Sequence, residues 1–149
     1  MAVPSLKINN PGNIRPGAKL WEGEVRPSYH TEGNGSFAVF KTMDYGVRAQ
    51  AKILLTYQNK YGLNTIRKII NRYAPPQDKN DTTSYVLSVA KQTGINPDTI
   101  IDLNNAKTLA AILKAQHKVE HGFAVNISSL SNGVLLALGK KKDSDLLEA

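Results

Sequence analysis

The chain has 149 residues, enough for one domain with a substantial core, and it has no cysteine, which excludes disulfides and thiolate metal sites. It contains no apolar run of membrane-spanning length, and its start, MAVPSLKINN, lacks the basic leader and apolar stretch of a secretory signal. The formal net charge of +7 suits an anionic partner such as nucleic acid, a membrane face or an anionic cell wall, although surplus lysines also serve solubility alone.

The first 41 residues predict loops and a small β-hairpin. They are rich in Gly, Pro and Asn, and their apolar residues occur in short runs. The segment TEGNG is the predicted turn, and SFAVF is the predicted second strand. Phe37 and Phe40 of that strand are candidates for the core.

From Thr42 onward the pattern predicts helices, each bounded by capping residues or prolines. The predicted segments are 42–62 with Thr42 or Asp44 as N-cap and Gly62 as C-cap, 64–74 capped by Asn64, 81–94 capped by Asp81 or Thr82, a short helix in 96–103 capped by Asn96, 105–121, and 128–139. The charged segment KKKDSDLLEA, 140–149, is expected to be a disordered tail. The sequence therefore predicts one mainly α (α+β) domain over residues 1–139.

The helix at 105–121 places a carboxylate on its packed face. Leu109, Leu113, Gln116 and Glu120 fall at offsets 0, 4, 7 and 11 of one stripe, with Ile112 beside it. Burial and the negative end of the helix dipole both raise a carboxyl pKa. A carboxylic acid that stays protonated near neutral pH can act as a general acid, as in glycosidases.

A structural role is the alternative for this carboxylate. A glutamate at a helix end can extend to solvent or pair with Lys118 or His121. This helix by itself favours the structural role.

Four blocks of the sequence carry a resemblance to a known group: NNPGNIR at 9–15, WEG at 21–23, APPQDKNDTTSY at 74–85 and HKVEHG at 117–122. With the segment FAVFKTMDYGVRA at 37–49, the chain resembles the glucosaminidases of the lysozyme-like superfamily. It more closely resembles a phage and prophage group of virion-associated, peptidoglycan-degrading proteins. The resemblance extends to about residue 138, and NNPGNIR together with APP…NDT is fairly specific.

The resemblance implies a lysozyme-like helical fold with Glu120 at the catalytic position and Gly122 as the glycine of its motif. In ordinary lysozyme-like enzymes the helix that carries the catalytic glutamate precedes the hairpin, whereas here it follows every other block. This order is compatible with a circular permutation of the fold. It leaves open whether Glu120 or an N-terminal glutamate, Glu22, Glu24 or Glu32, is the acid.

The resemblance also implies roles for two residues near the reaction. Glu32 lies where the glucosaminidases carry a second acidic residue, and the alternative is a turn residue without a role. Tyr85 matches a tyrosine near the catalytic glutamate, and the alternative is a core aromatic residue on an amphipathic helix.

Substrate-binding candidates lie in the N-terminal loops. Trp21 offers a flat ring for stacking on a sugar, or else fills space beneath the hairpin. Asn10, Asn13 and Arg15 can hydrogen-bond sugar hydroxyls, N-acetyl groups or the peptide stem, or else form a rigid turn that satisfies its own backbone. The three histidines, His30, His117 and His121, show no zinc-binding spacing, so no metal and no cofactor is expected.

Two functions remain open at this point. The first is a peptidoglycan-cleaving enzyme that acts on the β-1,4 bond between N-acetylated sugars, either as a two-carboxylate hydrolase or, as favoured here, as a lytic transglycosylase with a single acid. It would be virion-associated or delivered to the periplasm and cell wall, with peptidoglycan and other virion proteins as partners. The second is a non-catalytic basic phage structural or ejection protein that binds cell wall or DNA. No DNA-recognition motif stands out, so DNA is the less favoured partner.

Overall fold

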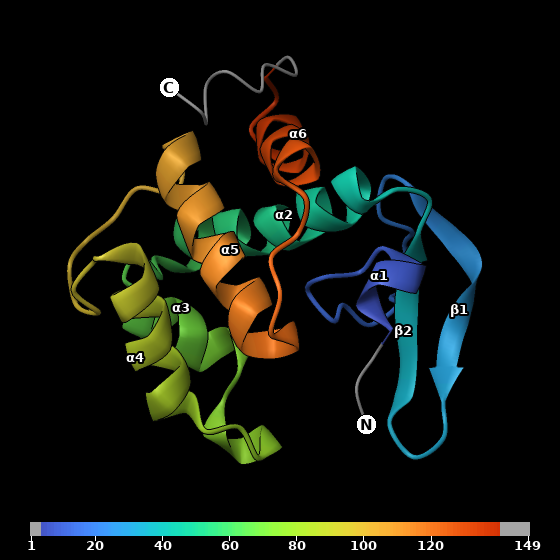
Figure 1. Cartoon of the computed structure of the whole chain (residues 1–149), viewed down its shortest axis with the longest axis horizontal. Coiled ribbons are helices and arrows are strands. Elements are labelled where there is room, and N and C mark those ends of the chain that lie inside the picture. Colours follow the sequence, from blue (N-terminus) through green and yellow to red (C-terminus); the bar gives the residue numbers. More distant parts are fainter. Residues whose placement is uncertain (1–3, 141–149) are drawn as a thin grey trace.

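Residues 4–140 are described by the computed structural model, and they form six α-helices and one β-hairpin (Figure 1). In chain order the elements are α1 (Ser5–Ile8), β1 (Glu24–Thr31), β2 (Gly35–Phe40), α2 (Met43–Tyr61), α3 (Ile66–Tyr73), the 3-10 turn η1 (Pro76–Asp78), α4 (Thr82–Thr93), α5 (Ala106–His121) and α6 (Ile127–Ala137). The predicted mainly α (α+β) class is confirmed. The lysozyme-like assignment, its permutation and the single-domain boundary stay predictions, and positions 141–149 of the predicted tail lie outside the described residues.

The helices begin and end close to the predicted capping residues. The side chains of Thr42, Asp81 and Asn105 accept hydrogen bonds from backbone amides in the first turns of α2, α4 and α5. The helix α3 is capped by Thr65, one residue later than predicted, and its hydroxyl accepts from the amide of Lys68 at 3.2 Å. Polar N-caps thus fix the helix starts locally.

The helix predicted within 96–103 does not form. The Asn96 side chain accepts from the amide of Asp98 at 2.9 Å, which makes a turn instead of a helix start. The Pro97 carbonyl then accepts from the amide of Arg67 at 3.0 Å, and the amide of Ile101 donates to the Asn64 carbonyl at 2.9 Å. The prediction was wrong because these backbone groups bind the start of α3, and a helix would have required them for itself.

The two strands form an antiparallel hairpin with Glu24 opposite Phe40 and Thr31 opposite Gly35. Its turn is the predicted one. Phe37 and Phe40 are buried, as predicted, and Phe40 belongs to a small core with Ile14, Ala38 and Ala49. This small core attaches the hairpin to the first half of α2.

The main core lies between α2 and the helices that follow it. Figure 1 shows α6 crossing α2 at the top of the molecule and α5 passing beside both. A side chain at Gly133 of α6 would approach Val47 of α2 to 2.5 Å, so the crossing requires glycine there. The C-terminal end of α5 lies between α3 and α4 on one side and α1 with the hairpin on the other (Figure 1). Within residues 4–140, no helix combines the length and apolar character that spanning a membrane requires.

Candidate active site

The N-terminal loop that carries NNPGNIR is fixed from within by one buried asparagine. The Asn10 amide nitrogen donates to the Ile14 and Ala38 carbonyls at 3.0 and 2.9 Å, and its oxygen accepts from the Ile14 amide at 3.0 Å. Asn10 is fully buried. Its predicted role in binding substrate is therefore corrected: its polar atoms hold the loop and the hairpin strand together, and no part of it can reach a ligand.

The same loop rests directly on the helix α2. A side chain at Gly46 would lie 1.9 Å from the Asn9 carbonyl oxygen, so only glycine allows this approach of loop backbone to helix. The Asn9 amide nitrogen donates to the Phe40 carbonyl at 2.9 Å. Hairpin and helix together hold the loop in one position.

This loop meets the end of α5, which lies more than a hundred residues away in the sequence. The Asn13 amide nitrogen donates to Oε1 of Glu120 at 3.3 Å, across 107 residues. Nε2 of His121 lies 2.8 Å from the Pro11 carbonyl oxygen. The loop therefore contacts the Glu120 end of the helix directly.

A buried tyrosine holds the other oxygen of the same carboxylate. The Tyr85 hydroxyl donates to Oε2 of Glu120 at 3.0 Å. Burial raises the pKa of the Tyr85 phenol far above its ordinary value, and the negative charge of Glu120 adds to the shift. The phenol therefore stays protonated and acts as the donor of the hydrogen bond to Glu120. Glu120 itself is half-buried, with each carboxylate oxygen bound to a donor from a different element.

A cleft of about 550 Å³ opens above this carboxylate. Its lining residues come from the N-terminal loop, the hairpin, the segment after α3 and the end of α5: Gly12, Asn13, Arg15, Asn34, Phe37, Tyr73, Ala74, Asp78, Asn80, Glu120, His121 and Phe123. The Arg15 guanidinium donates to the Asn34 backbone carbonyl and lies 4.3 Å from the centre of the Phe37 ring. Arg15 therefore connects the loop to the tip of the hairpin along one wall of the cleft.

Beneath the loop lies a buried polar chain from α2 to α5. Nε2 of His117 lies 2.7 Å from Oε1 of Gln50, and Nε2 of Gln50 donates to Oε1 of Gln116 at 3.2 Å. Burial, with a smaller contribution from the nearby His121, lowers the pKa of His117 to about 3. A neutral His117 that donates from Nε2 satisfies the contact with Gln50, and its Nδ1, an acceptor in this form, has no hydrogen-bond partner among residues 4–140. A side chain at Gly12 would approach Gln50 to 2.9 Å, so the loop packs on this chain.

The other predicted site residues lie apart from the cleft. Trp21 packs partly against the small core, as its structural alternative predicts, and its remaining surface lines two neighbouring hollows. Glu32 is exposed in the hairpin turn and is not among the residues that line the cleft. Glu22 pairs with Arg48 at 3.2 Å, and the buried Glu24 accepts from the Trp21 amide at 3.0 Å. None of these three glutamates reaches Glu120, so their predicted catalytic parts gain no support from the geometry.

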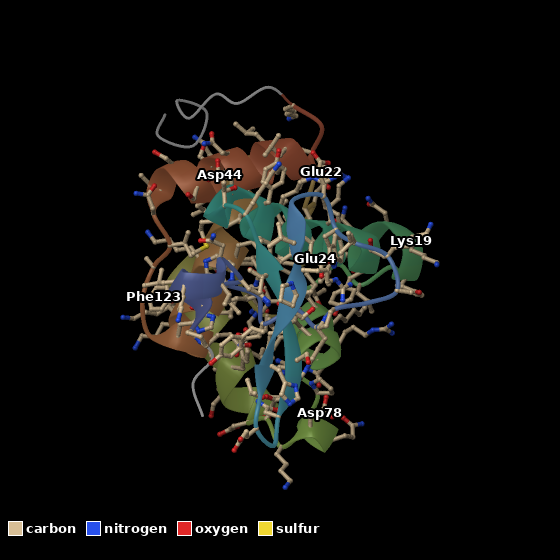
Figure 2. All side chains as sticks on the ribbon, turned by 90° about the vertical axis from the view of Figure 1, so that its right-hand side faces the viewer. Lys19, Glu22, Glu24, Asp44, Asp78 and Phe123 are labelled. Carbon is tan, nitrogen blue, oxygen red and sulfur yellow. The ribbon has the colours of Figure 1, made fainter. Side chains whose placement is uncertain are left out.

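Sequence reasoning missed three residues of the site. The Tyr73 hydroxyl donates to the Gly12 carbonyl, and burial raises the pKa of this phenol well above its ordinary value. His121 and Asp78 line the cleft. Asp78 lies at the same end of the molecule as the hairpin turn, and Glu22 and Glu24 lie toward the opposite end of the hairpin (Figure 2). The only signal for Asp78 was its place within the block APPQDKNDT. The spacing of residues in this block does not show which other segments Asp78 approaches in the fold.

Within residues 4–140, no three His, Asp or Glu side chains gather closely enough to suggest a metal site. No protein-family model matches the chain. The chain is 40% identical over 124 residues to Protein P5 of Pseudoalteromonas phage PM2, a match that covers 81% of this chain and 72% of that protein. This relative supports the predicted bacteriophage context. At this identity and coverage, the chain belongs to the family of Protein P5 of Pseudoalteromonas phage PM2.

Proposed function

We propose that this protein cleaves the β-1,4 glycosidic bond between the N-acetylated sugars of peptidoglycan, with Glu120 as general acid and then general base. The observation that carries the proposal is the position of Glu120 in the cleft, with Tyr85 on one oxygen and Asn13 on the other. A carboxylate held by two hydrogen bonds from separate elements has a fixed direction, which proton transfer requires.

Tyr85 can hold the carboxyl group in both steps of such a reaction, when Glu120 gives a proton and when it takes one, and Asn13 can hold it in the ionised form. Protonated Glu120 gives its proton to the glycosidic oxygen as the bond from that oxygen to the sugar C1 breaks. The carboxylate then takes the proton of the 6-hydroxyl of the same sugar, whose oxygen closes on C1 to give an anhydro sugar. Tyr85 keeps donating to Oε2 throughout. Asn13 donates to Oε1 when the carboxylate is ionised, and it releases Oε1 when this oxygen carries the proton that passes to the substrate.

Asp78 provides the one alternative route that the cleft suggests. It is the second carboxylate among the lining residues, and a two-carboxylate hydrolase would use it to activate water. The transglycosylase route needs only Glu120. In either case the net charge of +7 would keep the protein near an anionic wall, and the phage relative supports a place in the virion among other virion proteins.

Digestion of purified peptidoglycan tests the proposal, with mass spectrometry of the released fragments. Glu120→Gln should remain folded and lose activity by about 10²- to 10⁴-fold, the range expected for a lost general acid. The wild type should release anhydro fragments, which lack one water relative to hydrolysed ones. Asp78→Asn should keep most of the activity.

Two results would redirect the proposal. Reducing-end products together with an inactive Asp78→Asn variant would establish the hydrolase. A Glu120→Gln variant with normal turnover would exclude Glu120 as the acid. A wild type without activity would remove the enzymatic role, and salt-dependent affinity for DNA or cell wall would then identify a binding protein.

A further inference from the structure

A second hollow adjoins the cleft and shares part of its wall. Its volume is about 420 Å³, and Gly12, Asn13, Arg15 and Tyr73 line both spaces. Beyond these shared residues, the second hollow is lined by apolar and aromatic side chains, among them Trp21, Ile53 and Tyr57. The two spaces therefore adjoin along the Asn13–Arg15 loop, and a ligand in the cleft has an apolar surface on the other side of this loop.

A third hollow continues this path toward a basic surface. It has a volume of about 470 Å³ and shares Gly17 and Trp21 with the second hollow. Lys19, Arg48 and Lys52 line it, and Figure 2 shows Lys19 at the outer edge of the loop before β1. The track from Glu120 past Trp21 to these lysines is called the side track below.

The side track ends in positive charge that the protein leaves largely uncompensated. Arg48 pairs with Glu22 at 3.2 Å, and Glu22 is the only carboxylate that lines the third hollow. Lys19 and Lys52 form no ion pair within residues 4–140. Two lysine ammonium groups are thus available for carboxylates of a ligand.

The track is also preformed at its centre. The Glu24 side chain accepts from the Trp21 amide at 3.0 Å, and the indole packs against the small core of Ile14, Ala38, Phe40 and Ala49. A fixed aromatic surface binds an aliphatic chain with little loss of conformational entropy.

We propose that the side track binds the stem peptide that branches from the glycan strand, with Lys19 and Lys52 on its free carboxylates and its carbon chain against Trp21. The inference rests on the proposed function, since it takes the glycan itself to lie at Glu120. Sugar rings carry no charge, so they offer no group with which Lys19 and Lys52 could form ion pairs. A stem peptide starts at the sugar and carries carboxylates along a flexible chain, which matches a track that leaves the cleft and becomes basic.

Calorimetric titration of the full chain tests the proposal, with Glu120→Gln in every sample so that no ligand is cleaved. The ligands are a disaccharide–tetrapeptide, the same compound with its peptide carboxylates amidated, and chitotetraose, which has neither peptide nor carboxylate. The double substitution Lys19→Gln, Lys52→Gln should weaken binding of the first ligand about five- to tenfold, as two exposed charge contacts predict, and leave chitotetraose unchanged.

The control substitutes two exposed lysines away from the track, Lys91→Gln and Lys114→Gln, which removes the same net charge. Any one of four results would overturn the proposal. These are an equal loss of affinity in this control, equal affinity for the amidated peptide, no effect of the Lys19 and Lys52 changes, and no binding of the disaccharide–tetrapeptide. Tighter binding of duplex DNA that the same two changes abolish would assign the track to nucleic acid instead. Degradation of whole peptidoglycan is measured separately, so the proposed function can fail while the peptide site holds, and the reverse.

Discussion

The buried His117 predicts a specific loss of stability in acid. In the folded protein its pKa is about 3, because burial disfavours the charged ring and the nearby His121 adds to the shift. In the unfolded chain the ordinary value is about 6.5. Between these values the unfolded chain binds one more proton than the folded protein, so the free energy of unfolding falls as the pH falls through this window.

The magnitude follows from the two pKa values. From pH 7.5 to pH 4.5, protonation of the unfolded chain at this one residue removes about 2.7 kcal/mol from the free energy of unfolding. The folded state contributes almost nothing to the change over this range, since its own pKa lies below the range. Close to pH 5 the slope is about 1.4 kcal/mol per pH unit.

Urea denaturation of the wild type and of His117→Gln across this range measures the effect. Glutamine does not titrate, and its amide can still donate to Gln50, so on acidification the wild type should lose about 2.7 kcal/mol more of its free energy of unfolding than the variant does. A parallel loss in both proteins would refute the reasoning. The ring signals of His117 in NMR spectra of the folded wild type give an independent check, because they should not titrate above pH 4.5.

Two further substitutions test the contacts around the cleft. Tyr85→Phe removes a hydrogen bond to a charged group, so the turnover rate should fall about tenfold to a hundredfold; in a Glu120→Gln background it should cause no further loss, and an additive loss would show that Tyr85 acts elsewhere. Gly46→Ala places a methyl group 1.9 Å from the Asn9 carbonyl oxygen, so urea denaturation should show a loss of about 2 kcal/mol or more, together with reduced activity as Asn13 moves from the carboxylate; unchanged stability would contradict this packing.

Local signals in the sequence were enough for most of the fold. Thr42, Asp81 and Asn105 act on amides within three residues of themselves, so the helices that they start could be predicted from neighbouring residues alone. The helix predicted at Asn96 was wrong for the complementary reason. Its backbone groups bind residues of the α3 start that lie about thirty positions earlier, and no local pattern reveals such pairing.

The residues of the site also divide into those that a local pattern predicts and those that depend on contacts between distant segments. The stripe that ends at Glu120 could be predicted from helical periodicity. Tyr85 was predicted from the resemblance of the chain to the lysozyme-like enzymes. The role of Asn10 was misread because an exposed and a buried asparagine look alike in a loop sequence. Asp78 was missed because only the folding of the chain brings the segment after α3 and the hairpin to the same cleft.

The distance in sequence between Asn13 and Glu120 has a consequence for when the cleft forms during synthesis. One wall of the cleft is translated 107 residues before the opposing carboxylate. Until the ribosome has released the end of α5, the emerging chain contains the loop and hairpin without the group that they are meant to face. A chain that ends before Glu120 therefore carries no assembled cleft.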